Sequence, residues 1–130
     1  MEEAQVPKDD LPEIRWLPDV EDHDFPAAES YLLLLYPPQR VSEIVAALRQ
    51  APIARFKAKD IFRASGLSLL GISNSHVEKD RRKIEKGAAL SPLLLVRDPA
   101  HGSVVIADGY HRLCAVYGFC EDCWIPCRIA

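Results

Sequence analysis

An apolar run at residues 104–107, Val-Val-Ile-Ala, leads directly into Asp108-Gly109 and then into a helical pattern over residues 110–117. A short apolar run bounded by turn signals predicts a buried strand, here followed at once by a helix. Another apolar run, residues 93–96, precedes it across the turn-forming segment 98–102. The two runs therefore predict a strand hairpin whose second strand ends where a helix begins.

The composition is that of an ordinary globular chain. The 130 residues are 48% hydrophobic and 27% charged, which is enough for one domain with its own core. Sixteen basic and nineteen acidic residues give a net charge of -3. Because no overall positive field attracts a phosphate backbone, nucleic acid is not an expected partner unless a local patch exists.

The amino-terminal part of the chain predicts an irregular arm and a helical hairpin. Residues 1–26 contain four prolines and an acidic cluster, as expected for an arm. A helical pattern follows over residues 27–36 and is expected to stop at Pro37-Pro38, since proline cannot donate a backbone hydrogen bond. Apolar residues at helical spacing predict a second helix before Pro52: Val41, Ile44, Val45 and Leu48. The hairpin is expected to occupy residues 27–55.

The remainder predicts alternating strands and helices. Residues 56–62 alternate and predict a short strand, and residues 76–86 predict an exposed helix with Gly87 at its end. The charges of residues 78–83 mix signs at helical spacing, which is typical of a water-facing, ion-paired surface. Residues 124–129 predict a closing strand. We expect an α+β fold, layered as in α/β proteins, with a small mixed sheet in residues 56–130.

No segment of the sequence predicts membrane insertion or secretion. The longest apolar run near the amino terminus, residues 31–36, is far too short to cross a bilayer. The first residues are acidic, and no apolar signal region follows them. We therefore expect a cytoplasmic protein with no membrane partner.

The turn after residue 107 has the chemistry of an anion-binding site. A helix N-terminus offers unpaired N–H groups, Gly109 allows close approach of the backbone, and Arg112 can bind phosphate oxygens in a bidentate manner. The alternative is that Asp108 is an ordinary turn or N-cap residue and that His111 and Arg112 are solvated. Local chemistry alone does not favour either of these two interpretations over the other.

Residues 106–117, IADGYHRLCAVY, resemble the defining motif of the ParB/sulfiredoxin superfamily, in which a strand leads into a Gly-x-His-Arg helix start. The order of elements also agrees over residues 56–130, which implies the mixed sheet of that superfamily. The resemblance implies binding of a nucleotide such as ATP, ADP or CTP, with magnesium. It places Gly109, His111 and Arg112 at the phosphates, with Arg63 reaching across from a first strand.

The sequence also departs from two branches of that superfamily. Sulfiredoxins carry their catalytic cysteine at the position of Tyr110, so sulfinic-acid reduction by that mechanism is not expected. ParB partitioning proteins continue into a helix-turn-helix region, whereas this sequence stops at Ala130. Reading of centromere-type DNA is therefore not expected.

A phosphotransferase needs a general base or a metal-binding carboxylate near its acceptor. The candidates are Asp60, on the expected first strand, and Asp108, in the motif. Lys57 and Lys59 are candidates for neutralising phosphate charge, although lysines on a strand edge are more often simply solvated.

Four cysteines lie close together in the sequence. Cys120 and Cys123 form a C-x-x-C pair, with Cys114 six residues before it and Cys127 four residues after it. Four thiolates suffice for zinc, but the spacing fits no standard zinc module, and zinc is not expected. In a reducing compartment cysteines are expected as thiols or metal ligands more than as disulfides. We expect Cys114 and Cys127 to be buried and the other two to be loop thiols open to oxidation.

Three functional hypotheses follow. The first is a nucleotide-dependent phosphotransferase or nucleotidase, recognised by turnover of nucleotide. The second is a non-catalytic module that binds a ligand and docks a partner protein or a second copy through the helical hairpin. The third is a ParB-like DNA-binding protein or nuclease, which the acidic charge disfavours.

Overall fold

The computed structural model describes residues 12–71 and 74–130. Its elements follow in the order α1 (Asp24–Leu32), α2 (Pro38–Gln50), β1 (Ile53–Lys57), α3 (Ala58–Ser65), α4 (Ser75–Glu85), β2 (Leu93–Asp98), β3 (Ser103–Asp108), α5 (Tyr110–Phe119) and β4 (Trp124–Ile129). This combination of helices with one small mixed sheet confirms the predicted α+β class. Within these residues, no helix is both long and apolar enough to cross a bilayer.

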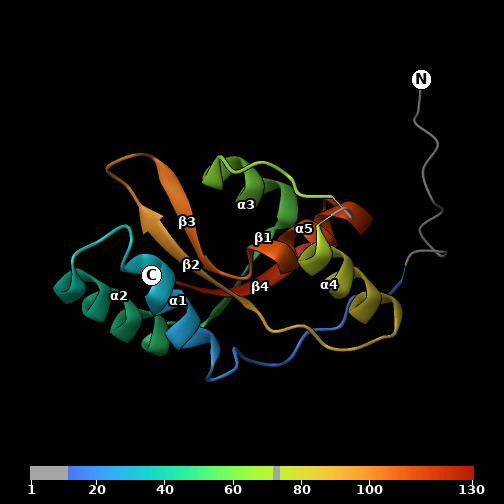
Figure 1. Ribbon diagram of the computed structural model, residues 1–130, viewed down its shortest axis with the longest axis horizontal. Helices are drawn as coiled ribbons and strands as arrows, with labels where there is room; N and C mark the ends of the chain where they lie inside the picture. Colours follow the sequence, from blue (N-terminus) through green and yellow to red (C-terminus); the bar gives the residue numbers. More distant parts are fainter. Residues whose placement is uncertain (1–11, 72–73) are drawn as a thin grey trace.

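The sheet has the strand order β1-β4-β2-β3. β1 and β4 are antiparallel, β4 and β2 are parallel, and β2 and β3 form an antiparallel hairpin. The predicted hairpin of two apolar runs is therefore confirmed, with Leu95 opposite Ile106. The last strand of the chain lies inside the sheet, between the first and the second (Figure 1).

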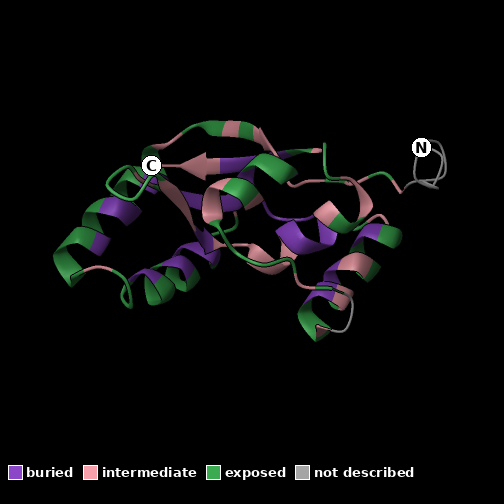
Figure 2. Cartoon of the chain, turned by 90° about the horizontal axis from the view of Figure 1, so that it is seen from above, coloured by how far each residue is buried: buried purple, intermediate pink, exposed green. Residues whose placement is uncertain are grey.

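Helices cover both faces of the sheet, because the strands alternate their side chains between two cores. On one face Leu94 and Val96 of β2 pack against α1 and α2. On the other face Leu93 and Leu95 pack against α3, α4 and α5. Burial on both faces explains why β2 is apolar without interruption over its first four residues. Figure 2 shows the buried residues on the inner sides of these layers.

The predicted helical hairpin is present, but its elements are shifted. α1 begins at Asp24, inside the predicted arm, and ends at Leu32, well before the two prolines. Pro38 is the first residue of α2, a position where its fixed φ angle suits the helix and its missing N–H costs nothing. Leu32 is buried, whereas the following Leu34 is 82% exposed. The prolines therefore start the second helix and do not stop the first.

The strand predicted at residues 56–62 is wrong. Of these seven residues only Phe56 and Lys57 lie in β1, and α3 begins at Ala58. The buried residues of α3, Ala58 and Ile61, are three positions apart, which is helical spacing. The backbone N–H groups of Ala58 and Lys59 donate to the carbonyls of Cys123 and Glu121, at 2.9 and 3.0 Å, and so fix the start of the helix.

The exposed helix predicted at residues 76–86 is confirmed as α4. Val77 and Ile84, the expected inward residues, are each 1% exposed. The side chain of Asn74 accepts hydrogen bonds from the N–H groups of His76 and Val77, and this N-cap explains where the helix starts. Gly87 adopts a φ of 77° just after the helix, as a C-terminal glycine does.

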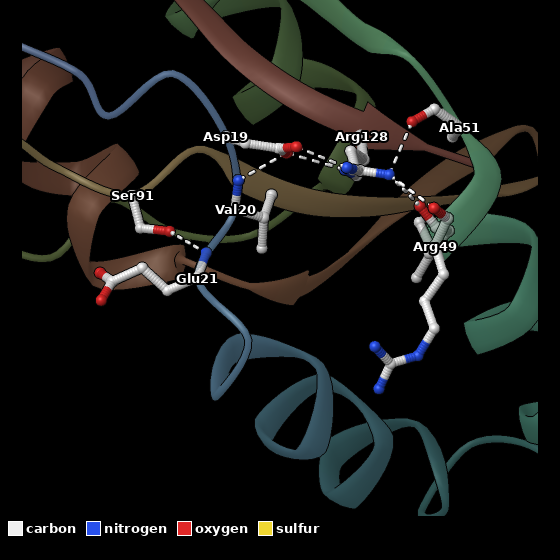
Figure 3. Close-up of polar contacts among 8 residues, drawn as sticks. Asp19, Val20, Glu21, Arg49, Ala51, Ser91 and Arg128 are labelled. Carbon is white, nitrogen blue, oxygen red and sulfur yellow. Dashed lines mark hydrogen bonds and ion pairs between the residues drawn. The ribbon is translucent and has the colours of Figure 1, made fainter.

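Arg128 of β4 joins three separate parts of the chain (Figure 3). Its Nε and Nη2 atoms donate to the carboxylate of Asp19 in the arm, at 3.0 and 2.6 Å. Its Nη1 atom donates to the carbonyls at the end of α2: Leu48, Arg49 and Ala51, at 3.3, 2.7 and 3.0 Å. One side chain therefore ties the arm and the C-terminal end of α2 to the sheet.

Candidate anion-binding site

A polar pocket lies where the first turn of α5 faces α4. Its volume is about 160 Å³. Four of its lining residues come from α4 and four from the junction of β3 with α5: His76, Lys79, Asp80, Lys83, Asp108, Gly109, His111 and Arg112. We call this space the anion pocket. The anion pocket lies between the motif of residues 106–117 and α4, and the β2–β3 hairpin separates these two segments in the sequence.

Gly109 lets the backbone turn from β3 into α5. Its φ angle is 103°, in the left-handed region that favours glycine. A Cβ atom placed there would lie 2.7 Å from Cγ of Leu93 and 2.9 Å from Nη2 of Arg112. Within the described residues no side chain caps α5, in contrast to α4 with Asn74. The first N–H groups of α5 therefore have no side-chain acceptor.

The guanidinium of Arg112 is held at the edge of the anion pocket. Its Nη2 atom donates to Oδ2 of Asp108 at 3.0 Å and to the carbonyl of Pro92 at 3.4 Å. Its side chain is 18% exposed. The Nε atom is buried, and no acceptor for it occurs in residues 12–71 and 74–130. The arginine is thus oriented by its neighbours while part of its donor capacity remains unused.

Asp108 has a neighbouring carboxyl group in Asp24 of α1. Burial raises the pKa of Asp108, Arg112 acts in the opposite direction, and Asp24 raises that pKa through its charge and a hydrogen bond. Asp24 is only 4% exposed and accepts a hydrogen bond from the hydroxyl of Ser91. Two carboxyl groups this close favour a state in which one carries a proton. The helical hairpin therefore reaches the motif through Asp24.

Replacing Asp24 by asparagine should lower the pKa of Asp108, since it removes a neighbouring negative charge. Because folding raises the pKa of Asp108, the folded state binds this proton more tightly than the unfolded chain does. The protonated carboxyl of Asp108 therefore contributes stability below pH 3.8, the ordinary carboxyl pKa, and this contribution is lost as the pH rises through the folded-state pKa. Asp24→Asn should therefore lose less stability than the wild type as the pH rises through this range. Carboxyl carbon NMR titration and denaturation at several pH values measure both effects.

Asp22→Asn is the matched control, because Asp22 is an exposed neighbour in the sequence and does not contribute to the raised pKa of Asp108. This variant should leave the titration of Asp108 unchanged. An unchanged pKa of Asp108 in Asp24→Asn would show that the two carboxyl groups do not interact.

Two histidines contribute to the anion pocket. The rings of His76 and His111 lie with their centroids 4.9 Å apart. Burial lowers the pKa of His111, and the charges of His76 and Arg112 add to this effect, whereas Asp80 opposes it. His111 is therefore neutral over more of the pH range than a free histidine. A bound anion would favour its charged form.

The structure brings together only part of the predicted site. Asp108, Gly109, His111 and Arg112 line one pocket. Arg63 is an exposed residue of α3, and its predicted reach toward the phosphates depended on a strand that is a helix.

The other three predicted residues also lie outside the anion pocket. Lys57 and Lys59 face Asp122, with Nζ to carboxylate distances of 4.0 and 2.6 Å. Asp60 lines a separate, mostly apolar cavity of about 220 Å³ with Phe56, Ile61 and others. The two lysines are thus engaged with an acidic loop, and the carboxylate of Asp60 belongs to a different cavity.

Sequence reasoning missed the α4 side of the pocket. His76, Lys79, Asp80 and Lys83 were included in, or adjacent to, a segment predicted to be a solvated surface. Part of that surface is as predicted, since Glu78 and Arg82 form an ion pair at 3.2 Å. The available signal was spacing: intervals of three, four and seven residues place the four side chains on one side of a helix.

The cysteines divide into a bonded pair and two buried thiols. Cys120 and Cys123 form a disulfide, so the expectation of free thiols is wrong for them. The turn brings their Cα atoms to 5.4 Å, within the range that a disulfide spans. Cys114 and Cys127 are buried, as expected. In the described part of the chain the four cysteines form no common group of metal ligands; the only such cluster there is Glu21, His23 and Asp24.

No protein-family model, curated protein or solved structure matches this chain. The resemblance to the ParB/sulfiredoxin superfamily therefore stays a prediction from the motif and the order of elements in the sequence. The interpretation of the site depends on its own geometry.

Proposed function

We propose that the anion pocket binds the phosphate groups of a nucleotide. The observation that carries this proposal is the convergence of Arg112, Lys79 and Lys83 on the start of a helix that has no side-chain cap. A helix N-terminus presents N–H donors and partial positive charge, and the three cations add full charges. Arginine and lysine are the residues that bind phosphate oxygens in proteins.

The charge balance of the pocket favours an anion. Lys79, Lys83 and Arg112 oppose two carboxyl groups, Asp80 and Asp108. Because burial and Asp24 raise the pKa of Asp108, its negative charge is lost on protonation more easily than that of an ordinary aspartate. A bound phosphate would also favour protonation of His111, and the protonated ring would then add a positive charge beside the phosphate.

The size of the pocket suits a phosphate group better than a whole nucleotide. Its volume of about 160 Å³ is below the 300–1,000 Å³ common for complete small-molecule sites. A shallower groove of about 460 Å³ adjoins it along α4, lined by Ser75, Glu78, Lys79, Arg82, Lys83 and Lys86. Lys79 and Lys83 line both spaces. The remaining parts of ATP, ADP or CTP, with magnesium, have room there.

Catalysis is the second candidate function, and Asp108 is the residue that supports it. It lies in the pocket, and burial and the Asp24 carboxyl raise its pKa, as is common for carboxyl groups that transfer protons in active sites. Asp60 offers no such support because it lines the other cavity. Binding without turnover requires none of these carboxyl groups to act, and we place it first.

Nucleotide should raise the melting temperature of the protein in the presence of magnesium. A ligand at one hundred times its dissociation constant stabilises the folded state by about 2.7 kcal/mol, which amounts to several degrees for a chain of this size. The measurement is a thermal-shift series with ATP, ADP, CTP and inorganic phosphate. Arg112→Ala and the double variant Lys79→Ala/Lys83→Ala should lose the shift.

Arg63→Ala is the matched control, since it removes an arginine that the motif implied but that lies outside the pocket. Its ligand-induced shift should equal that of the wild type. The proposal is wrong if the lysine double variant, correctly folded, keeps the full shift, or if no phosphate compound shifts the wild type at millimolar concentration. Release of inorganic phosphate from the stabilising nucleotide, absent in Asp108→Asn, then decides whether turnover occurs.

A further inference from the structure

The disulfide closes a four-residue turn between α5 and β4. Cys120 is the C-cap residue of α5, and Cys123 directly precedes β4. Both residues are partly exposed, and the two between them, Glu121 and Asp122, are exposed. Solvent therefore reaches the turn that carries the pair, as exchange with dissolved thiols requires.

The two remaining cysteines are protected from such chemistry. Cys114 is 2% exposed and Cys127 is fully buried. Burial raises the pKa of the Cys114 thiol, and it raises the pKa of Cys127 to about 11. Since the thiolate is the reactive form, both are poor nucleophiles at neutral pH. The fold thus separates two accessible sulfur atoms from two inert ones.

The surroundings of the turn differ at its two ends. The carbonyl of Cys123 accepts a hydrogen bond from the N–H of Ala58, so Cys123 lies at the positive end of α3, and Lys57 and Lys59 approach Asp122 beside it. Cys120 lies at the negative end of α5. A helix N-terminus favours a thiolate, whereas a helix C-terminus disfavours one; the two lysines are paired with Asp122 and add little net charge. Cys123 is therefore the better nucleophile.

We propose that Cys120 and Cys123 form a redox-active pair that interconverts between dithiol and disulfide by exchange with low-molecular-weight thiols and disulfides, and that Cys114 and Cys127 take no part. The proposal is independent of the anion pocket. Neither Cys120 nor Cys123 lines that pocket, so loss of nucleotide binding and loss of thiol exchange are separable outcomes.

The oxidising direction has two steps. The thiolate of Cys123 attacks one sulfur of a small disulfide RSSR; that S–S bond breaks, RS⁻ leaves, and a mixed disulfide forms. The thiolate of Cys120 then attacks the sulfur of Cys123, which forms the protein disulfide and expels the second RS⁻. The two protein thiols lose two electrons in total. RSSR gains them and, with the two released protons, becomes two RSH molecules.

The test is a redox titration of the full chain in mixtures of reduced and oxidised glutathione, with a metal chelator present. Each sample is quenched with acid, unfolded, and alkylated so that every free thiol is labelled. Mass spectrometry should show four labels at reducing ratios and two at oxidising ratios. Peptide mapping should assign both lost labels to Cys120 and Cys123, with the other two labelled throughout.

Two serine variants test the roles within the pair. Cys120→Ser should accumulate a glutathione adduct on Cys123, because no second thiol resolves it, and should do so faster than Cys123→Ser accumulates one on Cys120. Cys114→Ser should titrate as the wild type does. The wild-type titration alone overturns the proposal if the labelling of the pair does not change with the ratio, or if Cys114 or Cys127 loses its label. A faster adduct in Cys123→Ser overturns the assignment of Cys123 as nucleophile.

Discussion

Replacing Arg128 by methionine should lower the free energy of unfolding by about 2–4 kcal/mol. The substitution keeps an unbranched chain but removes five hydrogen bonds, two to Asp19 and three to carbonyls at the end of α2. Those carbonyls include groups that a helix leaves without partners. The side chain of Arg128 is 18% exposed, so water replaces its contacts only in part. Urea denaturation followed by circular dichroism measures the loss.

Asp19→Asn separates the ion pair from the helix contacts. Asp19 is half exposed, and solvent screening limits the value of its charge to about 0.5–1 kcal/mol. Arg128 lowers the pKa of Asp19, so this contribution is present above the ordinary carboxyl pKa and is lost as pH falls through the lowered value. If Asp19→Asn costs as much as Arg128→Met, the three carbonyl contacts contribute nothing and our account of Arg128 is wrong.

Replacing Gly109 by alanine should cost about 2–5 kcal/mol of stability and abolish ligand binding in the anion pocket. A left-handed φ angle disfavours any residue with a Cβ atom by about 1–2 kcal/mol. The new methyl group also meets Leu93, a residue with no exposed surface, and overpacking of this kind costs about 1–3 kcal/mol more. Any relief of the clash moves either the core or Arg112.

Gly66→Ala is the matched control. Gly66 also has a left-handed φ angle, 68°, but no atom lies within 4 Å of its added Cβ. It should therefore cost only the backbone share, about 1–2 kcal/mol, and leave ligand binding intact. Equal losses of stability in the two variants would contradict the close approach that we describe at Gly109. Denaturant unfolding together with the nucleotide thermal shift gives both readouts.

The error at residues 56–62 shows what local pattern can and cannot decide. The apolar positions alternate at Phe56 and Ala58 and then shift by one residue to Ile61 and Phe62. That shift marks the change from a strand period to a helical one. A strand that ends at Lys57 and a helix that starts at Ala58 have no turn residue between them, so neither glycine nor proline signals the boundary.

The candidate site was predictable on one side only. The residues from Asp108 to Arg112 are contiguous, and their chemistry points to an anion without any knowledge of the fold. The sequence pattern of the α4 residues is also typical of a solvated helix face. Only the packing of α4 against α5 makes these residues the wall of a pocket. The contact between Asp24 and Asp108 joins residues far apart in the chain, and no local pattern encodes it.

The position of β4 sets an order on the assembly of this fold. Among the described strands β1 pairs with β4 alone, and β4 also supplies the parallel partner of β2. During synthesis β1 therefore has no strand partner until Trp124–Ile129 has been made, while the local hairpin of β2 and β3 can form earlier. A nascent chain released before Trp124 would expose β1 and one edge of β2, both open to pairing with other chains.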